Sequence, residues 1–247
     1  MSKILSFNNK LLANPSGSKL LGVETLPPYT IRLRYRENTT PRSWGQGHFV
    51  QVSEYPNIWD LTYENSDWSA LLLQENNLIE VIDANTKGVT NMTHLFLECS
   101  SLTSISLFNT SSVTNMSGMF YFCTALRGSI PLFDTRNVTD MHEMFCWCSN
   151  LIEIPTFNTS NVTDMHDMLG FCSNLIEIPL FDTSNVIDME LMCRYCSNVL
   201  RGMLRLYEQA STQQNVPTHW RCFEQCGMSL TEERALIPQS WGGDGQG

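Results

Sequence analysis

Residues 134–157 of this chain read DTRNVTDMHEMFCWCSNLIEIPTF, and closely similar stretches lie before and after them. A cysteine marks the same point of each stretch, at intervals of 24 or 25 residues, at Cys99, Cys123, Cys148, Cys172 and Cys196. A valine recurs at the same interval, from Val89 to Val186. Such periodicity is typical of repeat architectures, because each unit needs its neighbours to cover its apolar face. The chain therefore contains five units, which we place at residues 85–206.

Each unit divides into two halves, as the unit at 134–157 illustrates. In its first half, the apolar residues between Val138 and Cys148 fall on one side of a helix. Asn137 suits a helix N-cap, and Asp140 stands three residues later, where a capping-box acid reaches back. The second half, residues 151–157, has the pattern of a short extended segment that would stack in a parallel sheet. We therefore expect an α/β solenoid, a leucine-rich-repeat-like array of five 24-residue units with a helix in each.

The sequence before the array predicts a β-rich N-terminal cap at residues 25–84. Residues 30–36 alternate between apolar and charged side chains, as a half-buried strand does, and residues 49–52 and 58–61 suggest two further strands. Residues 1–24 are expected to form an arm that docks onto another subunit.

The sequence after the array predicts a helical C-terminal cap at residues 207–247. Helices are expected at residues 199–210 and 230–236. The chain ends in Gly242-Gly243-Asp244-Gly245-Gln246-Gly247, which has no apolar side chain and is expected to be loose in isolation.

The repeat resembles the BspA-like leucine-rich repeat family, whose units read roughly Phe-Asp-Thr-Ser-x-Val-Thr-x-Met-x-x-Met-Phe-x-x-Cys-x-x-Leu. Residues 133–148, 157–172 and 181–196 match this pattern closely, whereas Ile187 and Cys193 depart from it. The resemblance implies a bacterial surface or adhesion protein, and similar chains occur among phage and prophage proteins. Family resemblance does not fix function, because one fold carries many activities.

Charge and hydropathy narrow the choice of partners and compartment. The formal net charge is −10, so binding to nucleic acid through phosphate neutralisation is not expected. No segment is apolar over the length that a membrane helix needs, and the first ten residues lack the features of a signal peptide or lipid anchor. We therefore expect a virion protein, which leaves the cell by lysis, with the bacterial cell surface as the alternative.

The cysteines are interpreted as buried free thiols, because the recurring ones fall on the inward stripe of each unit. Cys193 and Cys196 imitate a redox CxxC motif, but both occupy core positions of the repeat. Cys222 and Cys226 lie outside the array, and their role stays open between packing and zinc binding.

Few residues suggest chemistry. His142 and His166 occupy the same position on adjacent units, each followed by an acid, but solvated side chains are favoured over a metal site. The row Asp140, Asp164 and Asp188 is explained by helix capping, and the row Glu153 and Glu177 lies on exposed positions without an apolar pocket. We expect no catalytic residue, no metal and no cofactor.

One aromatic row stands out, one residue before each of four recurring cysteines: Phe122, Trp147, Phe171 and Tyr195. These rings could form a strip suited to sugars or to a partner protein. The alternative is that they fill gaps between helices. They are the candidate partner-binding residues.

The sequence thus predicts a non-enzymatic interaction, adhesion or structural protein, such as a decoration, fibre or tail component of a phage. Its expected partner is a glycan or protein on a host surface, or another virion subunit, and a homo-oligomer is possible. A bacterial adhesion protein is the first alternative, and a metal-dependent hydrolase on the acidic face is the second.

Overall fold

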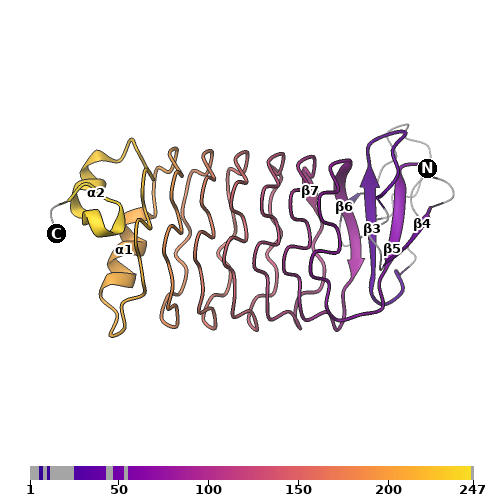
Figure 1. Ribbon diagram of the computed structural model, residues 1–247, viewed down its shortest axis with the longest axis horizontal. Helices are drawn as coiled ribbons and strands as arrows, with labels where there is room; N and C mark the ends of the chain where they lie inside the picture. The colour runs from indigo at the N-terminus through magenta and orange to yellow at the C-terminus, as the bar shows by residue number, and fades with distance from the viewer. Residues whose placement is uncertain (1–5, 8–9, 12–24, 43–46, 53–54, 246–247) are drawn as a thin grey trace.

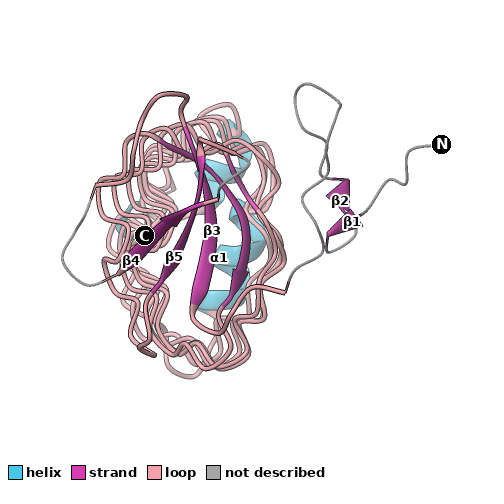
Figure 2. Ribbon diagram, turned by 90° about the vertical axis from the view of Figure 1, so that its right-hand side faces the viewer, coloured by secondary structure: helices cyan, strands magenta, loops and turns pink. Residues whose placement is uncertain are grey.

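The computed structural model describes residues 6–7, 10–11, 25–42, 47–52 and 55–245. Figure 1 shows an elongated molecule with a sheet near one end, a stack of turn-rich backbone coils in the middle and helices near the other end. We call each coil a rung. Seen along the stack in Figure 2, the rungs lie behind one another and follow the same closed outline.

The main sheet is mixed and has the strand order β4-β5-β3-β6-β7. Its strands are β3 (Thr30–Tyr35), β4 (His48–Gln51), β5 (Ile58–Thr62), β6 (Leu78–Asn85) and β7 (Ser104–Ile105). All neighbours pair antiparallel except β6 and β7, which pair in parallel. Strands β3, β4 and β5 confirm the three predicted segments, whereas β6 was not expected. A separate antiparallel pair joins β1 (Ser6–Phe7) to β2 (Lys10–Leu11), and the rest of the predicted arm at 1–24 lies outside the described residues.

The main sheet closes one end of the apolar interior. Ile31, Leu33 and Tyr35 of the central strand β3 are fully buried, as are Trp68 and Leu72 of the first rung. All five belong to one continuous cluster that runs on through the rungs. The sheet therefore covers apolar side chains that the first rung would otherwise expose to water.

The prediction of an α/β solenoid is wrong. Regular structure consists mainly of the five-stranded sheet, and the only α-helices among the described residues are α1 (Met203–Ser211) and α2 (Thr231–Leu236), with a 3-10 turn at Gln239–Trp241. Both helices lie at the end of the repeats or beyond them. The predicted helical halves are successions of turns, and the predicted extended halves contribute only β7 and one isolated parallel bridge between Glu177 and Arg201.

Hydrogen bonding explains why the apolar spacing does not produce helices. In the rung around Cys99, the N–H groups of Leu95, Leu97 and Cys99 donate to carbonyls three residues earlier in the same rung. The intervening N–H groups of Phe96 and Glu98 donate to the next rung instead. A helix would keep every such bond within one segment. Here half of them join neighbouring rungs, so the units depend on each other.

Left-handed backbone makes these tight turns possible. Two residues per rung have positive φ, four positions apart, for example Glu143 at 54° and Trp147 at 65°. The apolar side chains still recur every three or four positions, so they all point inward as they would on a helix. Val138, Met141 and Cys148 are each 0% exposed. The inward stripe was predicted well, and the backbone that carries it was not.

The predicted helix caps have other roles. The Asn137 side chain donates to the carbonyl of Ser111 on the preceding rung, and Asn161 and Asn185 repeat this contact. Asp140 accepts the backbone N–H of His142 and thereby closes a small turn. These residues order loops and join rungs, and they begin no helix.

Residues near the C-terminus are bonded to the rest of the chain, which their composition does not predict. The guanidinium of Arg234, in α2, is buried and pairs with Asp244 at 2.7 Å. Gly245 donates its N–H to the carbonyl of Ile237 at 2.9 Å. The expectation of a loose tail is therefore wrong as far as residue 245, because one buried cation holds it.

Candidate functional site

Four aromatic side chains form a continuous column along the turn-rich side of the rungs. The rings of Trp147 and Phe171 stack with centroids 3.9 Å apart and an interplanar angle of 7°. Tyr195 continues the stack at 4.7 Å and 6°, whereas Phe122 is tilted by 43° at 5.7 Å from Trp147. The structure thus brings together all four residues that the sequence singled out. We call Phe122, Trp147, Phe171 and Tyr195 the aromatic column.

The backbone fixes the alignment of this column. All four residues lie in the left-handed region, with φ between 58° and 65°, which is uncommon for bulky residues. Their N–H groups each donate to the next rung, as Trp147 does to the carbonyl of Gly170 at 2.8 Å. Each ring is therefore held directly beside its neighbour. Offset stacking at such distances contributes roughly 0.5–1.5 kcal/mol per pair, which helps to offset the strain of the backbone.

A buried ion pair supports the column from within. Asp167 is 3% exposed and accepts two hydrogen bonds from the Arg194 guanidinium, at 2.9 and 2.5 Å. The same guanidinium lies 4.8 Å from the centroid of the Phe171 ring, in cation–π contact. Gly170 leaves space for this arrangement, because a Cβ there would lie 1.9 Å from an Asp167 carboxylate oxygen. Phe171 is thus held both by its ring neighbours and by an anchored cation.

The stacking determines what the column can offer to a partner. Phe122 is 38% exposed, and the other three rings are half-buried. A ring between two stacked neighbours has its faces covered and presents its edge to solvent. Sugars usually pack on ring faces, so the inner rings Trp147 and Phe171 suit edge contacts with a protein or with a chain laid along the column. The predicted aromatic strip exists, but its inner rings present their edges to solvent and not their faces.

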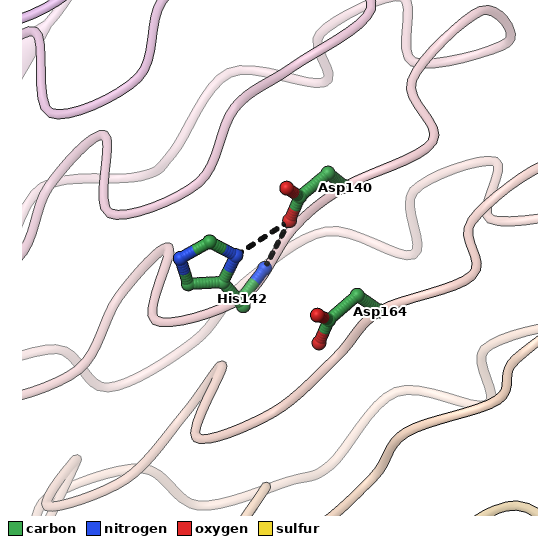
Figure 3. A group of neighbouring side chains, drawn as sticks. All are labelled: Asp140, His142 and Asp164. Carbon is green, nitrogen blue, oxygen red and sulfur yellow. Dashed lines mark hydrogen bonds and ion pairs between the residues drawn. The ribbon is translucent and has the colours of Figure 1, made fainter.

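A second row of side chains lies on the turn-rich side of the same rungs. Donor atoms of Asp140, His142 and Asp164 all lie within 4.8 Å of one another, and the three side chains are half-buried. Figure 3 shows Asp140 and His142 on one rung and Asp164 on the next. One carboxylate oxygen of Asp140 lies 2.8 Å from Nδ1 of His142 and also accepts the His142 backbone N–H. The hydrogen bond to this carboxylate raises the pKa of His142. Burial opposes ionisation of Asp140, but the bonds from His142 outweigh it and lower the pKa of Asp140.

A second group of donors lies one rung further along, with its histidine on one rung and both its acids on the next. His166, Asp188 and Glu190 also have donor atoms within 4.8 Å of one another. The acids that follow the two histidines in sequence are not members of either group. Asp167 instead turns inward and accepts a hydrogen bond from Arg194. We call Asp140, His142, Asp164, His166, Asp188 and Glu190 the histidine–aspartate row.

The repeated rungs match a known family. Residues 67–175 and 146–202 match the family described as Mycoplasma protein of unknown function, DUF285, and together these overlapping matches cover more than half of the chain. The chain belongs to the DUF285 family. No curated protein and no solved structure matches it. The DUF285 match begins at Asp67, which is also where the ladder of parallel bridges between rungs begins, with Asp67 against Asn91.

Among the described residues of this DUF285 chain, no helix has the length and apolar character needed to cross a membrane. The longer of the two α-helices in this described part has 9 residues, and a span needs about 20.

The cysteines of the DUF285 chain confirm the expectation of buried free thiols. All nine are free and buried, including Cys222 and Cys226 in the last rung. The thiols of the recurring row donate to a carbonyl of the preceding rung, as Cys148 does to Phe120 at 3.1 Å. Burial raises the pKa of Cys193 and of Cys196 well above the usual value, so the CxxC pair lacks the accessible thiolate that redox chemistry needs.

Two cavities lie on the other side of the rungs, in the extended halves. One of about 830 Å³ is lined in part by Leu107, Leu132 and Asp134, and the other of about 500 Å³ by Ile152, Glu177 and further residues. Neither cavity contains the aromatic column or the histidine–aspartate row. Glu177 is paired with Arg201, which does not favour its use as a general acid or base.

Sequence reasoning missed that Asp164 lies beside His142 and Asp188 beside His166, and it missed the link between Asp167 and Arg194. The signal was present, because the aspartate and histidine positions both recur at the repeat spacing. Residues at one repeat position on adjacent rungs must be neighbours in space. The proximity of the aspartates to the histidines was overlooked because the aspartates were interpreted only as helix caps.

Proposed function

We propose that this DUF285 protein is a non-enzymatic interaction protein that presents its rungs to a macromolecular partner. The partner is a protein or glycan on a host surface, or another subunit of the same assembly. The observation that carries the proposal is the aromatic column, in which four aromatic rings line up over four rungs and remain partly exposed. Aromatic side chains supply large contact area at small entropic cost, and they are enriched in the energetic centres of interfaces.

The proposal includes membership of the wider group of BspA-like repeat proteins and a place in a phage virion, as a decoration, fibre or tail component. The match of residues 133–148 to the BspA-like repeat pattern supports the first part. A long stack with a sheet at one end and helices at the other suits an element that spans between partners (Figure 1). Repeat surfaces of this kind bind over many rungs at once, which suits adhesion.

A bacterial cell-surface adhesion protein is the second candidate. The family description names mycoplasma proteins, and this supports the second candidate. The genes that flank the coding sequence separate the two, since capsid and tail genes would place the chain in a virion. A metal-dependent hydrolase has less support, because neither cavity contains the histidines or their neighbouring acids.

The binding proposal is tested with the labelled chain on a glycan array and on intact bacterial cells. We expect the Trp147→Ala/Phe171→Ala variant to lose at least about tenfold in affinity, the loss of one to two good interface contacts. Ile152→Ala/Ile176→Ala is the matched control, because it removes two apolar side chains from the extended halves of the same two rungs. Equal binding by the two variants would contradict a role for the aromatic column.

A further inference from the structure

The histidine–aspartate row has a composition that the aromatic column does not explain. It places two imidazoles and four carboxylates over three consecutive rungs. Main-chain bridges join Asp140 to Asp164 and Asp164 to Asp188, so these acids stack directly above one another. Backbones that pair in this way lie about 4.8 Å apart. Like charges at this spacing repel, and the repeat holds them together nonetheless.

We propose that the row binds two divalent transition-metal ions, with zinc as the representative ion. One site consists of Asp140, His142 and Asp164, and the other consists of His166, Asp188 and Glu190. Each site takes ligands from two adjacent rungs, so each ion ties neighbouring rungs together and neutralises part of the acidic row.

The ligand types select this class of ion. Imidazole nitrogen suits zinc, copper, nickel and iron, whereas calcium and magnesium prefer oxygen ligands alone. Zinc binds histidine nitrogen and carboxylate oxygen at about 2.0–2.2 Å, so donors around one ion lie roughly 3–4 Å apart. The donors of each site lie within 4.8 Å of one another, slightly farther apart than this. Small rotations of half-buried side chains close this difference.

Neighbouring groups already orient the first site. The Asn115 side chain, on the preceding rung, donates to the second carboxylate oxygen of Asp140 at 3.1 Å. One carboxylate oxygen of Asp164 accepts the backbone N–H of His166 at 2.9 Å. Such outer contacts fix the direction of ligating carboxylates in metal sites. Three protein ligands leave a coordination position for water, on a surface where neither described cavity lies.

Isothermal titration of the full chain with zinc chloride, at a slightly alkaline pH that keeps imidazole neutral, tests the proposal. We expect the wild type to bind two ions, and His142→Ala and His166→Ala to bind one ion each. Asp164→Asn should also bind one, because its carboxylate crosses to the site on the preceding rung. The double histidine variant should bind none, and the exposed His48→Ala, in strand β4, should still bind two.

Thermal unfolding gives a second readout that does not depend on calorimetric stoichiometry. A ligand that binds only the folded state raises the melting temperature. Zinc should raise it in the wild type and in His48→Ala but not in the double histidine variant, and magnesium should raise it in none of them. A wild type that binds no zinc, or a double histidine variant that binds as much as the wild type, would overturn the proposal. Neither site shares a residue with the aromatic column, so failure here leaves the proposed function standing.

Discussion

The inner and outer surfaces of the rungs follow the same 24-residue period but differ in how strictly they keep it. Inside, the cysteine, methionine and valine rows repeat almost unchanged, and nearly every member is fully buried. Outside, the position of His142 and His166 holds threonine, serine, glutamate or tryptophan in other rungs, and the aromatic column covers four rungs only. Uniform rows are what a continuous core requires, because each rung packs on identical neighbours. Outer positions whose residue changes from rung to rung are not required by stacking, so stacking alone does not explain which residues they hold.

The first rung sharpens this contrast, because it breaks the inner row. Glu75 occupies the position that cysteine holds in the later rungs and is 2% exposed. Its carboxylate accepts the backbone N–H of Arg42 at 2.9 Å. Burial raises the pKa of Glu75 to about 7, and the contact with Arg42 opposes this rise only in part. A titrating group therefore sits where the stack meets the sheet.

The largest effect is expected from a change on the inside. Phe145 is fully buried, and its ring stacks with that of Phe120 at 5.4 Å. Phe145→Ala should lower the free energy of unfolding by about 3–5 kcal/mol, through lost burial and a residual cavity. Ile152→Ala, in the same rung but 52% exposed, should cost less than about 0.5 kcal/mol. Urea denaturation of both variants measures the difference, and similar losses would break the distinction between the two surfaces.

The ion pair beneath the aromatic column comes next. Asp167→Asn should destabilise the chain by about 2–3 kcal/mol, because the Arg194 guanidinium loses its charged partner in a largely buried place. Glu143→Gln is the matched control, since Glu143 occupies the same repeat position one rung earlier and is half-exposed. Thermal denaturation of both should show a clear loss only for Asp167→Asn. An equal effect would mean that the pair does not anchor the column.

Glu75 predicts a dependence of stability on pH. Its pKa in the folded chain, about 7, lies above the usual 4.5, so the folded state holds the proton more tightly than the unfolded state does. The corresponding stability is fully present below about pH 4.5 and is lost as the pH rises through 7. Between about pH 5 and pH 8, the free energy of unfolding should fall by about 2 kcal/mol more in the wild type than in Glu75→Gln.

The control for this pH series is Glu232→Gln in α2, where the side chain is exposed. It should follow the wild-type curve within about 0.5 kcal/mol. Urea denaturation at several pH values gives all three curves. Parallel curves for Glu75→Gln and the wild type would show that Glu75 does not titrate in this range.

A smaller effect on stability than those of Phe145, Asp167 and Glu75 is expected from the aromatic column itself. Trp147→Ala should cost only about 1 kcal/mol, because it removes stacking contacts from a half-buried ring. Phe122→Ala should cost less, since Phe122 is tilted at the end of the column and more exposed. A loss from Trp147→Ala as large as that from Phe145→Ala would place the column in the core.

Much of the interior could be predicted from the sequence, because period and polarity decide which side chains are buried. The inward stripe from Val138 to Cys148, the buried thiols and strands β3 to β5 all follow from patterns of this kind. The backbone of the rungs could not be predicted in the same way, because a spacing of three to four residues between apolar side chains fits both a helix and a succession of tight turns. The choice between them depends on where the backbone N–H groups bond, and single positions such as Trp147 carry no sign of their left-handed backbone.

The candidate site was predictable in part for the same reason. Phe122, Trp147, Phe171 and Tyr195 share one repeat position, so their proximity follows from the period. The face-to-face stacking of Trp147, Phe171 and Tyr195, and the inward turn of Asp167 toward Arg194, depend on side-chain torsions that the period does not determine.

The central claim is that the aromatic column serves recognition and the inside serves stability, and one paired measurement on Trp147→Ala/Phe171→Ala tests it most directly. We predict that this variant keeps its fold, with a free energy of unfolding within about 2 kcal/mol of the wild type, while its binding to the array or to cells falls about tenfold or more. A variant that unfolds as readily as Phe145→Ala, or one that stays folded and binds as well as Ile152→Ala/Ile176→Ala, would contradict the claim.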